Sequence, residues 1–232
     1  MNPVLSTALL GGALAVDNRS SLRLLVSQPL CGGLLTGLLL GEPRAGFFAG
    51  AILQMLFLGW MNVRGGRAPD LPLGGVTAAA LSILARKVPA SEAGVPGLIL
   101  FLAILGALAV AVVGRALYRY GESRSYVLTE TALRFIGEGR MRLACGLHLS
   151  SLAAHFVAGF AIVGAAVLIG PRIIAGVTRV TPALWSDAMG PLAVLLPFVG
   201  AGTLLARNLA RIRLFLFLAG FLIVYLMSFF GG

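Results

Sequence analysis

Residues 54–72 read QMLFLGWMNVRGGRAPDLP, and this stretch decides how the first half of the chain is interpreted. An apolar segment ends at Trp60 and Met61, and polar or flexible residues follow as far as Asp70. A second apolar segment then begins at Leu71. The turn between the two segments is either an ordinary surface loop or the tip of a hairpin that enters between other helices, and the rest of the sequence bears on this choice.

The composition points to a lipid environment. Of the 232 residues, 59% are hydrophobic and only 11% are charged, which is about half the charged fraction of a soluble globular domain. Mean hydropathy is +0.98 and the net charge is +10. The basic residues lie between long uncharged runs, where membrane proteins keep Arg and Lys, and they form no basic stripe of the kind that binds nucleic acid. The sequence therefore predicts an integral membrane protein and no nucleic-acid partner.

Uncharged runs set the expected helices. A helix needs about 20 apolar residues to cross a bilayer, and a longer run spans with tilt. The runs that meet this length are 24–41, 45–63, 93–114, 143–171, 188–206 and 214–232, whereas 1–16 and 71–85 are short. We predict one all-α membrane domain over residues 1–232, with about six full transmembrane helices plus short or re-entrant helical hairpins.

Residues 118–142 interrupt this pattern with five arginines and three glutamates. The segment reads as an aqueous loop with a short amphipathic helix over 127–136, and it divides the chain into halves at 1–117 and 143–232. The positive-inside rule places it in the cytoplasm. A second basic cluster, at residues 207–213, is expected on the same side because two spans separate the clusters.

Glycine and proline spacing in the first half indicates close packing and broken helices. Gly33, Gly37 and Gly41 recur every four residues, as do Gly46 and Gly50. Small residues at this spacing let helices approach closely in lipid. Interrupted helices in a membrane are tolerated where protein or water satisfies the freed backbone groups, which is typical of transporters.

A resemblance runs through residues 24–80. The chain resembles the enzyme IIC subunit of the mannose–sorbose family of the bacterial sugar phosphotransferase system. The motifs that carry it occur in the family's order and spacing: Pro29-Leu30, Leu40-Gly41-Glu42, the glycines Gly46 to Gly50, Leu53-Gln54-Met55, Leu58-Gly59-Trp60-Met61-Asn62 and Ala68-Pro69-Asp70.

The resemblance implies a sugar-translocating subunit of the bacterial plasma (inner) membrane, multi-pass, in a hetero-oligomer. Its implied partners are a IID membrane subunit and soluble IIA and IIB phosphocarriers, with IIB phosphorylating the sugar. The chain itself is implied to be neither phosphorylated nor an enzyme, and no cofactor is implied. The positions that match sugar-contacting residues are Gln54, Asn62 and Asp70, and amides and carboxylates suit sugar hydroxyls because these both donate and accept hydrogen bonds.

Several positions depart from the family pattern. Gln54 stands where Glu is common, Gln28 stands where Arg is common, and Arg64 and Arg67 occupy a turn that is usually small and neutral. These departures keep an alternative open, namely a non-transporting membrane scaffold or sensory relic. A facilitator without phosphoryl coupling is a third candidate.

A polar patch lies within the apolar run 143–171. His148 and His155 are seven residues apart on one helix face, with Ser150 and Ser151 between them. Their role is either a hydrogen bond between helices or a substrate or gating function. No third ligand with suitable spacing accompanies the histidines, so no metal site is predicted. The sequence contains no HExxH, GxSxG or P-loop motif, so no enzyme active site is predicted either.

Overall fold

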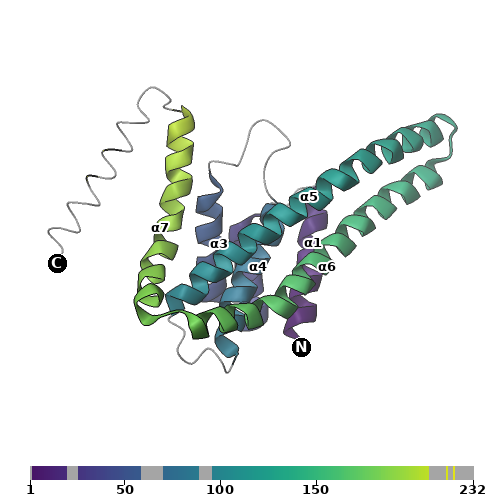
Figure 1. The fold of residues 1–232 in the computed structure, drawn as a ribbon. Coiled ribbons are helices and arrows are strands. Elements are labelled where there is room, and N and C mark those ends of the chain that lie inside the picture. The colour runs from purple at the N-terminus through teal and green to yellow at the C-terminus, as the bar shows by residue number, and fades with distance from the viewer. Residues whose placement is uncertain are drawn as a thin grey trace.

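The structure is a computed structural model that describes residues 2–19, 26–58, 70–88 and 96–208, together with the single residues 218 and 222. Every regular element in these ranges is helical (Figure 1), which confirms the all-α class. The elements are α1 (Pro3–Arg19), α2 (Pro29–Leu40), α3 (Pro43–Leu56), α4 (Leu71–Leu84), the 3₁₀ turn η2 (Ala85–Lys87), α5 (Pro96–Gly137), α6 (Met141–Val180) and α7 (Ala183–Asn208).

Three stretches of the described helices are long and apolar enough to cross a membrane: Pro96–Arg119 of α5, all of α6, and Trp185–Leu204 of α7. The runs 24–41 and 45–63, expected to span fully, instead form the 12-residue α2 and the 14-residue α3. Twelve helical residues reach only about 18 Å, well short of the ~30 Å hydrocarbon core. The predicted span at 214–232 lies outside the described ranges.

Proline and glycine explain why α2 and α3 are short. Each helix has Pro in its first turn, Pro29 in α2 and Pro43 in α3, a position where the missing N–H is no loss. Gly41 then ends α2 in the left-handed region, at φ 79°, which glycine adopts at little cost. The two helices fold back on each other as a hairpin.

Gly33, Gly37, Gly46 and Gly50 lie at the contact of this hairpin, as their spacing predicts, whereas a Cβ at Gly41, the last of the first series, would meet nothing within 4 Å. A Cβ atom at Gly33 would stand 2.6 Å from the Gly46 carbonyl oxygen and 2.8 Å from the Gly50 Cα. A Cβ at Gly37 would stand 2.7 Å from the Glu42 carbonyl oxygen. Backbone therefore lies against backbone, and no larger residue fits without separating the helices.

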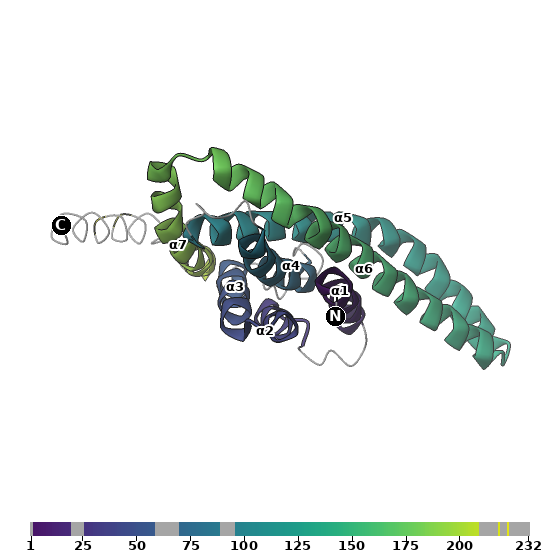
Figure 2. The ribbon, with the colours of Figure 1, turned by 90° about the horizontal axis from the view of Figure 1, so that it is seen from below.

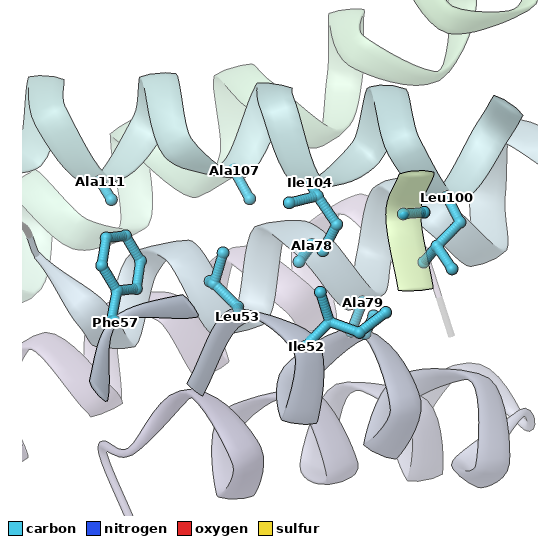
Figure 3. Close-up of a cluster of buried hydrophobic side chains, with 11 residues drawn as sticks. Ile52, Leu53, Phe57, Ala78, Ala79, Leu100, Ile104, Ala107 and Ala111 are labelled. Atoms are coloured by element: carbon cyan, nitrogen blue, oxygen red, sulfur yellow. The ribbon is translucent and has the colours of Figure 1, made fainter. Parts of the chain in front are cut away.

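Helix α4 forms the centre of the bundle. It contacts α1, α2, α3, α5 and α6 (Figure 2), and its residues from Pro72 to Ile83 are buried. Ala78 and Ala79 pack on one side into an apolar cluster with Leu53 of α3 and Ile104 and Ala107 of α5 (Figure 3). Small residues on α4 allow this burial on all sides. Asp70 immediately precedes the helix, near the end of the stretch quoted at the outset.

Residues 118–142, predicted as a loop with a short amphipathic helix over 127–136, are instead almost wholly helical, so the predicted helix is part of a much longer one. Helix α5 continues through Gly137, residues 138–140 form a tight turn with Gly139 at φ 72°, and α6 starts at Met141. The two helices extend beyond the other elements (Figures 1 and 2), and we call residues 119–137 and 141–150 the arm. The charges mark an exposed helical surface and no break in the helix, because apolar Leu128, Ala132 and Ile136 recur at helical spacing on the side that borders α6.

Helix α7 runs from the end of the bundle opposite the arm toward the end that carries it (Figure 1). Near its start, Gly190 lies against Gly97, and farther along Gly200 lies against the end of α3 at Met55 and Leu56. The end of α7 is therefore at the arm's end of the molecule. Of the second basic cluster, expected at residues 207–213 on the same side, only residues 207 and 208 belong to the described ranges.

Candidate functional site

A cavity of about 390 Å³ lies between α1, α4, α5 and α6, close to the base of the arm. Its volume falls within the ~300–1,000 Å³ common for small-molecule sites. Most of the lining is apolar, and the polar side chains are Asp70, Tyr118, Ser150, Ser151 and His155.

Asp70 is held in this cavity by the backbone at the start of α4. Its N–H donates to the Ala111 carbonyl of α5 at 2.9 Å, and its carbonyl accepts from the Gly74 N–H at 3.2 Å. Gly114 of α5 lets the helices approach, since a Cβ there would stand 3.0 Å from the Asp70 Cβ. The residue is only 8% exposed. A carboxyl group is thus fixed at the junction of two helices, inside an apolar surround.

His155 enters the cavity from α6 with its tautomer determined by geometry. Nδ1 lies 2.7 Å from the Ser151 carbonyl oxygen. A carbonyl only accepts, so Nδ1 carries the proton, and in the neutral ring Nε2 is then an acceptor. The Tyr118 ring of α5 lies beside the imidazole, with 6.0 Å between ring centroids and a tilt of 47°. The cavity therefore combines an imidazole, a phenol, two serines and a carboxyl group.

The structure divides the predicted polar patch. Ser151 and His155 line the cavity together with Asp70, although 80 residues or more separate them from it in sequence. His148 lines a different groove, of about 720 Å³, that runs along the arm, and Ser151 lines this groove as well as the cavity. Seven residues amount to about 10.5 Å along a helix, which places the two histidines at different levels.

Gln54 is half-buried and binds the start of α2. Its Nε2 donates to the Gln28 Oε1 at 3.2 Å, and its Oε1 accepts from the Leu30 N–H at 3.4 Å. The Leu30 N–H is one of the first-turn donors that lack a partner within their own helix. Two departures from the family pattern, Gln28 and Gln54, thus lie against each other. Gln54 is absent from the described lining of the cavity.

Several residues singled out in the sequence lie outside the part of the chain that the structure describes, and one cavity residue was not predicted. Asn62, Trp60, Arg64 and Arg67 lie outside the described ranges, as does the choice between a surface loop and a hairpin tip. Tyr118 went unrecognised because it begins the segment interpreted as a loop; its signal would have been the continuation of the helix from residue 96. Within the part of the chain that the structure describes, no three His, Cys, Asp or Glu side chains gather as a metal site.

The fold and the cavity define an all-α membrane protein that has a short-helix hairpin, α2–α3, and a largely apolar cavity with a few polar side chains between α1, α4, α5 and α6. The family model for the sorbose-specific IIC component of the PTS matches residues 4–230. The chain therefore belongs to this family.

Individual relatives are more distant. The sorbose-specific EIIC component of Klebsiella pneumoniae is 30% identical over 128 residues, which cover 55% of this chain and 44% of that protein. The mannose-specific EIIC component of Escherichia coli K12 is 33% identical over 76 residues, or 29% of each chain. The fructose permease IIC component of Bacillus subtilis is 38% identical over 60 residues, or 26% of this chain and 22% of that one. The chain thus matches less than half the length of these relatives.

A solved structure titled "Structure of membrane protein" shares the fold. The TM-score is 0.63 at 22% identity, over 98% of this chain and 85% of the other. The arrangement of helices described above is therefore present in a second protein.

Proposed function

We propose that this chain is the sugar-translocating IIC subunit of a mannose/sorbose-type phosphotransferase system. It holds a hexose-like sugar in the cavity between α4, α5 and α6 and passes it inward for phosphorylation by a partner IIB. The observation that carries the proposal, within a chain of this family, is the meeting of Asp70, Ser151 and His155 in one cavity.

The lining matches the chemistry of a sugar. The Asp70 carboxylate accepts hydrogen bonds from sugar hydroxyls, and bonds of this charged kind are stronger than those to a neutral amide. The His155 Nε2 accepts another, while Ser151 both donates and accepts. The Tyr118 ring offers an apolar face to the C–H surface of a pyranose. The resemblance adds Gln54 and Asn62 as further candidate contacts.

The complex works by alternating access. The short helices and the long α5–α6 pair belong to parts that move against each other, with the sugar near the bilayer midplane. A IID subunit completes the sugar pathway, and soluble IIA and IIB subunits carry the phosphoryl group. The chain resides in the bacterial inner membrane and is not itself phosphorylated.

The decisive experiment measures uptake of radiolabelled mannose, sorbose and fructose by cells that express the chain with its partner subunits, with and without the phosphoryl donor proteins. Donor-dependent accumulation of a phosphorylated sugar is the expected result, and it names the substrate. Accumulation that persists without donors would favour a facilitator. No accumulation, with the complex present in the membrane, would favour the scaffold alternative.

A further inference from the structure

Thr77, in the middle of α4, is fully buried, and its hydroxyl has no hydrogen-bond partner among the described residues. Other buried threonines in helices behave differently. Thr7 donates to the Pro3 carbonyl at 2.6 Å, Thr36 to the Gly32 carbonyl at 2.7 Å and Thr178 to the Ala175 carbonyl at 3.0 Å. Such local bonding is the usual solution for a helical threonine. A buried hydroxyl without a partner is destabilising, so its presence calls for a reason.

The position of Thr77 on α4 suggests a reason for the unpartnered hydroxyl. Asp70, Leu73, Thr77 and Leu81 are spaced by three or four residues and share one face of the helix. Asp70 and Leu73 line the sugar cavity. Leu81 lines another groove, of about 560 Å³, which lies between α5 and α6 and is distinct from the groove along the arm. Thr77 therefore lies at the level between the two spaces.

Contacts of α4 with α5 and α6 locate Thr77 along the helix axis. A Cβ at Gly114 would stand 2.8 Å from Leu73, and a Cβ at Gly106 would stand 3.0 Å from Leu81. Thr77 thus faces the part of α5 between these two glycines. Ile162 of α6 lines both the cavity and the groove, so it lies at the same junction.

We propose that the Thr77 hydroxyl, one helical turn beyond the Leu73 lining of the cavity, is a sugar-contacting group of the translocation path when the sugar leaves the cavity. The inference rests on the proposed function and extends its site along α4. The described lining of the groove beyond is entirely apolar. Thr77 therefore offers the last side-chain hydroxyl on this face of α4 before an apolar barrier. It both donates and accepts, as a sugar hydroxyl does, and it lacks a fixed partner because its partner is the moving sugar.

The test compares two substitutions that separate stability from transport. Thr77→Val keeps the shape and removes the hydroxyl, whereas Thr77→Ser keeps a hydroxyl. Loss of one hydrogen bond to the sugar predicts about a tenfold fall in kcat/KM for uptake in Thr77→Val, with a melting temperature in detergent at or above that of the unsubstituted chain. Thr77→Ser retains most of the uptake. Thr36→Val is the matched control, since it removes an equally buried hydroxyl that bonds to its own helix.

The outcomes distinguish this inference from the function it rests on. Uptake of labelled mannose, sorbose or fructose with unchanged kinetics in Thr77→Val would overturn the role of Thr77 alone. An equal loss in Thr77→Val and Thr36→Val would likewise overturn it, because the effect would then follow any removed hydroxyl. Failure of the unsubstituted complex to accumulate all three sugars would overturn the proposed function and this role with it.

Discussion

Asp70 shows how much one side chain depends on its surroundings. The sequence places it after a flexible turn, and the resemblance suggests sugar contact. Its burial beside Gly114, and the bond from its N–H to Ala111, become visible only when α4 lies against α5. Neither the glycine nor the carbonyl lies near Asp70 in the sequence, so no local pattern could have predicted them.

Asp70→Asn is expected to reduce sugar uptake by about 100-fold while leaving the amount of protein in the membrane unchanged. The amide keeps the size of the side chain but loses the charge. A hydrogen bond to a charged group contributes ~1.5–3 kcal/mol and one to a neutral group ~0.5–1.5 kcal/mol, so two weakened bonds together cost about 2–3 kcal/mol. Labelled-sugar uptake and immunoblotting of membranes check this. Asp187→Asn is the control, because Asp187 is exposed on α7 away from the cavity. Normal uptake by Asp70→Asn would remove Asp70 from the site.

The two histidines should behave differently. His155→Ala removes an acceptor from the cavity and is expected to raise the KM for sugar about tenfold. His148→Ala changes the groove along the arm, outside the cavity, and is expected to leave the KM unchanged. Kinetics of uptake measured side by side check the pair. Equal effects would mean that the polar patch acts as one unit, contrary to its division in the structure.

At the scale of elements, the glycine spacing correctly predicted the close contact of α2 and α3. Their length was misjudged, because uncharged residues continue past the points where Pro29, Gly41 and Pro43 end or begin a helix. The arm was predicted as a loop and is helical, and this error has the opposite cause. Charged residues break an uncharged run but do not break a helix, and α5 continues through them.

Gly46→Ala tests the contact between these helices. The added methyl would collide with backbone atoms of Gly33 and Gly37, which have no rotamer to change. We expect destabilisation of about 1–3 kcal/mol and a lower melting temperature in detergent. Gly202→Ala is the control, since a Cβ there meets nothing within 4 Å in α7. That substitution should be neutral or stabilising by up to ~1 kcal/mol. A melting temperature for Gly46→Ala equal to that of the control would contradict the contact.

At the scale of the whole molecule, the arm and the end of α6 lie at opposite ends of the bundle (Figure 1). The positive-inside rule places the arm in the cytoplasm. We therefore expect a cysteine at Glu138, in the turn of the arm, to resist a membrane-impermeant maleimide in intact spheroplasts. A cysteine at Arg179, near the end of α6, should react.

This measurement needs Cys31 and Cys145 replaced by Ser beforehand, because both are free thiols. Inverted vesicles should reverse the labelling pattern. Reaction of Glu138→Cys in intact spheroplasts, with Arg179→Cys protected, would show that the chain has the opposite orientation, with the arm outside. Reaction of both positions from the same side would contradict the arrangement of the helices.

The sequence by itself determined the all-α membrane class, the close contact of the glycine-rich helices and the family. These properties follow from local signals: long uncharged runs, small residues four apart, and short motifs in a fixed order. Only the tertiary structure decided that α4 is central, that residues 119–137 and 141–150 form the arm, and that Asp70 shares a cavity with His155 and not with His148. Those properties depend on which helix faces meet, and contacts between residues far apart in the sequence leave no periodic trace in a single chain.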